Sequence, residues 1–314
     1  MKRILGLVLL LAVGASHGAT PAQAGKTDLM WDHLRIAVAD VEQHVDGVLG
    51  VAIRDLTSGQ ELLVHADEVF PQASSIKISV LAELYHQAEQ ATQGIAGKAR
   101  LNDSYLVRGE DLVADSDIMG GLTVGVTRLT NRDLATMMVA VSDNAATNVL
   151  IDRVGMDNVT QLMMAQGLHH TQLRRKMLDL KAAGEGRENI STPREMMTLL
   201  DRLYRGKVLG APLLEDFWTM LATHKNSWLP RGLPEDLRIA DKPGELEGVR
   251  NDSGIVFLKN RPYIICVMTT YLSSERSGEE AISAISKAAY GMFDRLSRAS
   301  EYGRVISPGN GSLR

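Results

Sequence analysis

A serine and a lysine three residues apart form the first group in this sequence that could do chemistry. They stand in Ser74-Ser75-Ile76-Lys77, at the start of a run that predicts a helix. Side chains three apart lie on one helical face, so the lysine amine would sit beside the Ser74 hydroxyl. A nearby base activates a serine as a nucleophile, and a helix N-terminus favours negative charge on its oxygen. Alone, this spacing is too common to establish a site.

A second polar group, Ser142-Asp143-Asn144, lies between two predicted helices. Its serine could relay a proton to a leaving nitrogen, and its asparagine could hold a substrate amide. An isolated group of this kind is more often a helix cap or a turn.

A third group, Lys242-Pro243-Gly244, follows a predicted strand. Lys242 could polarise the serine of the second group and attract a substrate carboxylate, and Gly244 would let substrate lie against the strand. The backbone N–H groups of Glu245 and Ser74 would then form an oxyanion hole.

Taken together and in this order, the three groups resemble the S-x-x-K, S-D-N and K-T-G motifs of class A β-lactamases and penicillin-binding proteins. Residues 70–77 read F-P-Q-A-S-S-I-K, which is similar to the F-P-x-A-S-T-x-K run of class A enzymes. Residues 142–148, S-D-N-A-A-T-N, are similar to their S-D-N-x-A-A-N run, which ends here at Asn148. The likeness spans nearly the whole chain after its first 24 residues, over about residues 28–300. It implies a monomeric serine hydrolase that opens a β-lactam ring through an acyl-enzyme on Ser74.

One departure from class A concerns release of the acyl group. The resemblance implies a glutamate that activates the hydrolytic water, in a segment similar to R-W-E-P-E-L-N. Residues 175–181 read R-K-M-L-D-L-K, which places Met177 at the glutamate position. Asp179 is the nearest acid, and Asp179 and Asn148 are the candidates for deacylation. Because deacylation needs a base on a water, three outcomes stay open: Asp179 replaces the glutamate, Lys77 serves both half-reactions, or the acyl-enzyme persists.

Two further departures concern charge. Asn189 stands where the family has the aspartate that pairs with Arg175, so we expect at most a hydrogen bond there. Pro243 replaces the threonine whose hydroxyl would bind a substrate carboxylate. Arg250, in a predicted turn over 247–252, either supplies a replacement charge or is an exposed hairpin arginine.

Three functions therefore remain for comparison. The first is a β-lactamase, and the second is a penicillin-binding peptidase or an esterase on the same scaffold, favoured by Met177 and Pro243. The third is a β-lactam-binding or sensor module that is acylated without turnover.

The predicted elements would position these groups within one α+β domain. They are, in order, a helix over 30–45, strands over 50–55 and 61–64, helices within 75–205, strands over 239–242, 254–258 and 263–270, and a helix over 279–297. This order predicts an antiparallel sheet flanked by helices, with an all-helical subdomain inserted into it. We expect an α/β part at about 25–73 and 206–314, and a helical part at about 74–205.

The first 24 residues predict a secretory signal peptide. Lys2 and Arg3 precede a short apolar run over 4–15, and Ala22-Gln23-Ala24 is a typical cleavage site. We expect cleavage after Ala24, with cleavage after Ala19 as the alternative. We therefore expect an exported, periplasmic protein, without a lipid anchor because no cysteine lies near the cleavage site.

Charge and cysteine content exclude several other classes. The net charge is −4 with no long run of one sign, which gives nucleic-acid binding no electrostatic support. Cys266 is the only cysteine, so no internal disulfide can form, and its apolar surroundings predict a buried side chain. The pair His169-His170 has the wrong spacing for a zinc site and predicts a surface turn. No metal or cofactor is expected, and the partner is a small-molecule substrate.

Overall fold

The computed structural model describes residues 25–300 and 302–305, so the predicted signal peptide lies outside the described residues. One antiparallel sheet of five strands organises the molecule, in the order β2-β1-β9-β8-β7. Its strands are β1 (Val48–Asp55), β2 (Glu61–Val64), β7 (Ile239–Leu246), β8 (Val249–Val256) and β9 (Tyr263–Thr270). The sheet thus joins the first and last parts of the chain, and the helical segment between them is an insertion, as the element order predicted.

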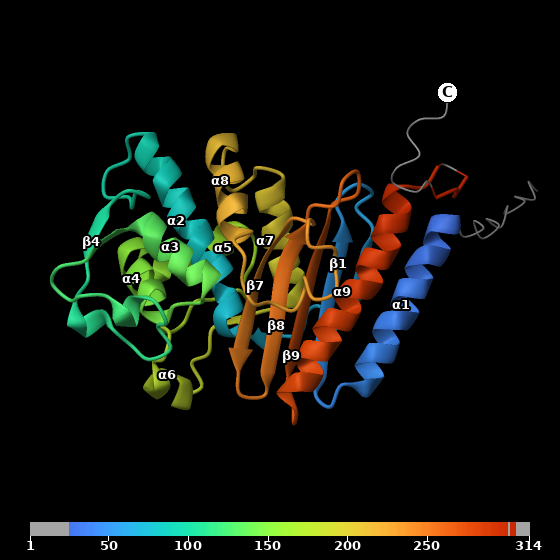
Figure 1. Ribbon diagram of the computed structural model, residues 1–314, viewed down its shortest axis with the longest axis horizontal. Coiled ribbons are helices and arrows are strands. Elements are labelled where there is room, and N and C mark those ends of the chain that lie inside the picture. Colours follow the sequence, from blue (N-terminus) through green and yellow to red (C-terminus); the bar gives the residue numbers. More distant parts are fainter. Residues whose placement is uncertain (1–24, 301, 306–314) are drawn as a thin grey trace, which may run out of the picture.

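Two long helices cover the outer face of this sheet (Figure 1). They are α1 (Lys26–His44) and α9 (Glu275–Ser297), which pack against each other. Phe293 of α9 stacks on Tyr263 of β9 with ring centroids 4.1 Å apart, and meets Trp31 of α1 edge-on at 5.7 Å. Alternate apolar residues of the strands complete this outer core.

The inner face of the sheet meets the helical part, at the left of Figure 1. Its helices are α2 (Lys77–Thr92), α3 (Asn131–Ala140), α4 (Asn144–Val154), α5 (Met156–Ala165), α6 (Leu180–Gly184), α7 (Pro193–Tyr204) and α8 (Ala211–Leu221). Helix α7 lies against β1, β8 and β9, while α8 contacts both β7 and α2. The two parts therefore meet along α7, α8 and the short 3₁₀ helix η1 (Ala73–Ile76).

Smaller elements complete the helical part. They are the strand pairs β3 (Phe70–Pro71) with β6 (Ile190–Ser191) and β4 (Ser104–Leu106) with β5 (Arg128–Thr130), and the 3₁₀ helices η2 (Gly109–Asp111) and η3 (Met119–Gly121). Within the described residues, no helix combines the length and the apolar character needed to cross a membrane.

The hairpin between β7 and β8 differs from the prediction. The turn over 247–252 is in fact only Glu247-Gly248, with Gly248 in the left-handed region at φ 66°. Strand β8 begins at Val249, so Arg250 is a buried strand residue, and its interpretation as an exposed hairpin arginine is wrong. The polar run from Arg250 to Ser253 hid the strand from the sequence pattern. Helix α8 was also missed in the sequence.

Candidate active site

Ser74 lies in η1, directly ahead of α2, at the junction of the sheet and the helical part. The backbone before it is held tightly: Gln72 N–H donates to Asn189 O at 2.7 Å, and Ser75 Oγ donates to Gln72 O at 2.6 Å. Ala73 has φ 48°, a left-handed conformation that a side chain adopts at a cost. This fixed turn presents Ser74 to the pocket, where the side chain is partly exposed.

Gly244 of β7 packs against the backbone of η1. A Cβ at this position would lie 2.6 Å from Gln72 O, 2.8 Å from Ser75 N and 3.1 Å from Ser74 N. The glycine is thus needed for close contact between two backbones, which is a different reason from the substrate contact expected from the sequence. The contact brings the strand that carries Glu245 N–H beside Ser74 N–H, the two donors expected to form the oxyanion hole.

Lys77 is almost fully buried behind the serine. Its Nζ donates to Ser142 O at 2.6 Å and to Asn144 Oδ1 at 2.9 Å, and lies 2.9 Å from Ser142 Oγ. Burial, and next the charge of Lys242, lower the pKa of this amine well below its usual value. Lys77 is therefore suited to being a neutral base.

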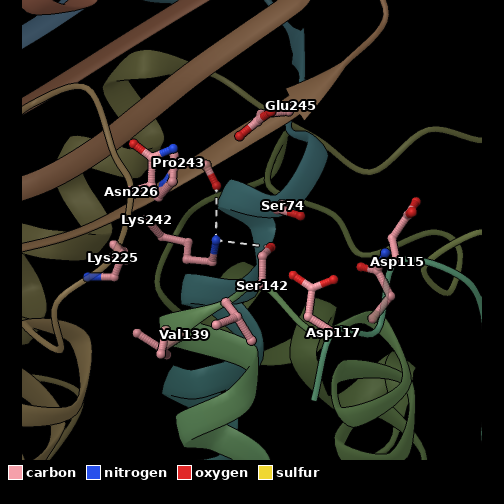
Figure 2. A pocket seen from close by; sticks show the side chains of 13 residues that line it. Ser74, Asp115, Asp117, Val139, Ser142, Lys225, Asn226, Lys242, Pro243 and Glu245 are labelled. Carbon is pink, nitrogen blue, oxygen red and sulfur yellow. Dashed lines mark hydrogen bonds between the residues drawn. The ribbon is translucent and has the colours of Figure 1, made fainter. Parts of the chain in front are cut away.

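Lys242 approaches the same hydroxyl from the sheet. Its Nζ donates to Ser142 Oγ at 3.1 Å and to Pro243 O at 3.2 Å, as Figure 2 shows. Burial, and next the charge of Lys225, lower the pKa of Lys242 to about 8, so the amine is mostly charged at neutral pH. Ser142 Oγ thus lies within 3.1 Å of two buried amines whose pKa values are both lowered.

Ser142 itself is held in a strained turn at φ 60°. Asp143 caps α4 by accepting the N–H of Ala146 at 2.9 Å, and its second oxygen accepts from Ile118 and Met119. The structure therefore brings Ser74, Lys77, Ser142, Asn144 and Lys242 together around one cavity of about 580 Å³, lined in part by Ser74, Ser142 and Lys242 (Figure 2).

Met177 lies in a second cavity of about 430 Å³ that also opens onto Ser74. The side-chain amide of Asn148 forms two hydrogen bonds with the Met177 backbone. Asn148 Nδ2 donates to Met177 O at 3.1 Å, and Met177 N–H donates to Asn148 Oδ1 at 2.8 Å. Both polar ends of Asn148 are therefore occupied in holding the loop. Met177, whose thioether cannot act as a base, therefore lines the same cavity as the nucleophile.

Asp179 lines neither of these two cavities. Its Oδ1 accepts the N–H of Ala182 at 2.9 Å, which makes it the N-cap of α6. Arg175 keeps an ion pair that the sequence did not predict, because its Nη2 lies 2.7 Å from Oε2 of Glu188, the residue before Asn189. Asn189 adds the expected hydrogen bonds to the Arg175 backbone. The acid next to Asn189 in sequence was the available signal for this pairing.

Arg250 points away from the serine, to the outer face of the sheet. Its guanidinium pairs with Glu275 and Glu279 of α9 and donates to Leu246 O and Val249 O. Among the described residues that line the two cavities, Arg250 does not appear. The structure therefore gives it a bracing role between β8 and α9.

Several pocket residues were missed in the sequence. Lys225, Asn226, Asp115 and Asp117 line the first cavity beside Ser74, with Glu245 at its edge (Figure 2). They come from irregular segments after α8 and before η3, which carry no periodic signal. The short acidic group around residues 115–117 was the only sequence feature that could have indicated part of this rim.

The motif resemblance is borne out by comparison with known proteins. The sequence profile described as the β-lactamase enzyme family matches residues 33–293. This chain belongs to that family. β-Lactamase SME-1 of Serratia marcescens is 28% identical over 299 residues, covering 91% of this chain and 96% of that enzyme. The carbapenem-hydrolysing β-lactamase KPC of Klebsiella oxytoca is 29% identical, covering 78% and 84%.

Solved structures of this β-lactamase family and its relatives share the fold. A β-lactamase from Sphaerobacter thermophilus is 29% identical with a TM-score of 0.73, covering 83% of this chain and 96% of that one. A mutant of PBP-A, described as an acyl-enzyme complex with penicillin G, is 25% identical with a TM-score of 0.75, covering 85% and 97%. The α+β fold predicted from the sequence is thereby confirmed.

Proposed function

We propose that this member of the β-lactamase family hydrolyses β-lactams through an acyl-enzyme on Ser74. The observation that carries the proposal is the buried Lys77 amine, whose pKa is well below its usual value, one helical turn from a serine at the mouth of a cavity. Family membership and the β-lactamase names of the relatives support the substrate class.

The proposed acylation step moves one proton in a defined direction. Neutral Lys77 takes the proton of Ser74, and Ser74 Oγ forms a bond to the β-lactam carbonyl carbon. The N–H groups of Ser74 and Glu245 stabilise the oxyanion. As the ring C–N bond breaks, the nitrogen receives a proton through Ser142, which lies 2.9 Å from Lys77 Nζ and 3.1 Å from Lys242 Nζ.

Deacylation is the weaker half of the proposed cycle. Met177 offers no base, the Asp179 carboxylate caps α6, and the Asn148 amide is bonded to the Met177 backbone. Lys77, which regains its neutral form after acylation, is the remaining candidate base, one helical turn from Ser74. We therefore propose slow release of the acyl group, with Lys77 as the base for both half-reactions.

A penicillin-binding role without efficient turnover is the second candidate function. Met177, in a cavity that Ser74 also lines, favours it, and the PBP-A mutant described as an acyl-enzyme complex with penicillin G is a structure of similar fold. Time courses with nitrocefin and a fluorescent penicillin separate the two functions. Steady hydrolysis without a trapped adduct supports the hydrolase, whereas a stable adduct of one penicillin per chain supports penicillin binding. Reaction with neither compound contradicts both and favours an esterase.

Replacing Met177 by Glu tests the account of deacylation. A carboxylate at this position could activate a water, so the penicillin adduct should disappear at least about 10-fold faster than in the wild type. Met177→Gln is the matched control, because a glutamine side chain is similar to glutamate in size and polarity but has no basic carboxylate. Equal release rates in both variants would contradict this account.

We also propose that the protein is exported to the periplasm and acts there on small molecules as a monomer. The basic start, apolar run and Ala22-Gln23-Ala24 support export. N-terminal sequencing of the protein from a periplasmic fraction should begin after Ala24. A mature chain that retains Met1 would contradict cleavage.

A further inference from the structure

Two carboxyl groups lie buried on the outer face of the sheet, directly behind Lys242. Asp241 precedes Lys242 in β7, and Asp252 lies in β8; they are 2% and 0% exposed. In the strand register Asp241 opposes Gly254 and Asp252 opposes Pro243, so the two carboxyl groups are diagonal neighbours on one face. The Lys242 side chain leaves β7 from the other face, because successive strand residues point in opposite directions.

Each of these carboxyl groups has a donor for only one of its oxygens. Asp252 Oδ2 accepts from the backbone N–H groups of Trp228 and Leu229, both at 3.0 Å. Asp241 Oδ1 lies 3.4 Å from Lys225 Nζ. The other two oxygens, Asp252 Oδ1 and Asp241 Oδ2, are buried and have no donor among the described residues. One proton between the two carboxyl groups would satisfy both oxygens.

The charged groups around this pair come from several elements. Lys225 follows α8, Lys242 belongs to β7, and Arg250 of β8 is already paired with the glutamates of α9. The thiol of Cys266 in β9 is buried and its pKa is raised to about 12, chiefly by burial, so it stays neutral. On the α9 side, the hydroxyls of Ser283 and Ser286 donate to Trp228 O and Leu229 O. Glu279 of α9 also pairs with Arg231, which lies two residues after Leu229, at 3.0 Å.

Two buried carboxyl groups in contact cannot both ionise readily. Burial, and next the neighbouring Asp241, raise the pKa of Asp252 well above its usual value. Asp241 and Asp252 in turn raise the pKa of Lys242, against the stronger effects of burial and Lys225. The charge of the pair is therefore coupled through β7 to the lysine that contacts Ser142.

We propose that Asp241 and Asp252 share one proton, so that the pair carries a single negative charge, and that this charge is a positioning element that keeps Lys242 protonated in the catalytic site. The shared proton stands independently of the proposed function, whereas the effect on Lys242 rests on it.

Replacing Asp252 by Asn tests the shared proton without an activity assay. The amide oxygen can still accept from Trp228 and Leu229, and the NH₂ group can donate to Asp241. A raised folded-state pKa means that the folded protein keeps a proton that the unfolded chain releases, so wild-type stability falls as pH rises above the usual carboxyl range. In urea unfolding, the stability of Asp252→Asn relative to the wild type should therefore increase from about pH 5 to about pH 8. A difference that does not change with pH would overturn the shared proton.

The pH dependence of Ser74 acylation tests the effect on Lys242. Asp241→Asn and Asp252→Asn each leave one negative charge. The pH at which the acylation rate declines on the alkaline side should therefore stay within about 0.3 pH units of the wild type. The double variant removes the charge, and its alkaline decline should move to lower pH because less negative charge stabilises the ammonium. If each single variant shifts the alkaline decline equally and the shifts add in the double variant, the wild-type pair carries two charges and does not share a proton. If a folded double variant shows no shift, the pair does not keep Lys242 protonated. A failure of acylation in the wild type would count against the proposed function and leave the unfolding result valid.

Discussion

At the scale of single residues, the site depends on two buried lysines with different electrostatic surroundings. Lys77 and Lys242 are both buried and both lie near Ser142 Oγ, yet the pKa of Lys77 is well below its usual value and that of Lys242 is about 8. The carboxyl groups behind Lys242 account for part of this difference, and the charge of Lys242 further lowers the pKa of Lys77. One amine is thereby suited to accept a proton and the other to stabilise negative charge.

The first prediction concerns Lys77→Arg. A guanidinium keeps the positive charge but cannot lose its proton in a protein, so it can replace a structural cation but not a base. We expect acylation by penicillin to slow by roughly 100-fold or more, measured by the rate of adduct formation in intact-mass spectra. A variant that folds normally and acylates within a fewfold of the wild type would mean that Lys77 is not the base.

The second prediction concerns the charge of Lys242. As pH rises through about 8 the ammonium is lost, so acylation should decline over this range. Lys242→Arg stays protonated at higher pH, so its alkaline limb should disappear or shift upward even if its maximal rate is lower. The rate of adduct formation is measured in both proteins across the pH range. If the rate declines at the same alkaline pH in both, another group causes the decline.

At the scale of elements, the contact between β7 and η1 sets the geometry of the oxyanion site. Gly244 allows the strand to lie against the backbone at Gln72 and Ser75, where a Cβ would come within 2.6–2.8 Å. Because backbone atoms rather than flexible side chains line this contact, it cannot relax easily.

The third prediction is that Gly244→Ala separates β7 from η1 and misplaces the N–H groups of Ser74 and Glu245. Acylation should slow on the order of 100-fold, as on loss of an oxyanion donor. Gly291→Ala is the control, because its Cβ would meet nothing within 4 Å and it lies in α9. Adduct formation should be unchanged in the control. Equal rates in the two variants would contradict the importance of this backbone contact.

The elements also show what sequence patterns could and could not predict. Ser74, Lys77, Ser142 and Lys242 were predictable because short motifs fix their spacing on a helix start, a turn and a strand. Arg250 was misplaced because its polar neighbours broke the alternation that would have indicated β8, and only the strand register decides which face it occupies.

Residues from irregular segments were less predictable still. Lys225 and Asp115 reach the cavity from loops whose path depends on tertiary packing, so spacing alone gave no position for them. Glu188, which pairs with Arg175, precedes by one residue the position aligned with the family's aspartate. A motif alignment without the structure does not resolve an offset of one residue.

At the scale of the whole molecule, two apolar cores lie on opposite faces of one sheet. The inner core joins the sheet to the helical part that carries Ser74, and the outer core joins it to α1 and α9. The site lies at the inner boundary, so the apolar packing of the outer core supports it through the stability of the sheet, whereas the outer-face carboxyl groups of Asp241 and Asp252 act on Lys242 by charge.

The fourth prediction follows from this separation. Phe293→Ala removes the ring that stacks on Tyr263 and contacts Trp31, and should cost about 3–5 kcal/mol of the free energy of unfolding. Tyr302→Ala, at a 77% exposed aromatic, should change it by less than about 0.5 kcal/mol. Where both variants are folded, acylation should match the wild type. A large loss of acylation in folded Phe293→Ala would show that the outer core also shapes the site.

The most direct test of the account is to identify the residue that penicillin acylates. The protein is incubated with penicillin G and digested, and the modified peptide is sequenced by mass spectrometry. Ser74→Ala is the matched variant, and Ser277→Ala in α9 is the control. We expect one adduct on Ser74 in the wild type, its loss in Ser74→Ala and its retention in Ser277→Ala. An adduct on another residue, or undiminished reaction in Ser74→Ala, would contradict it.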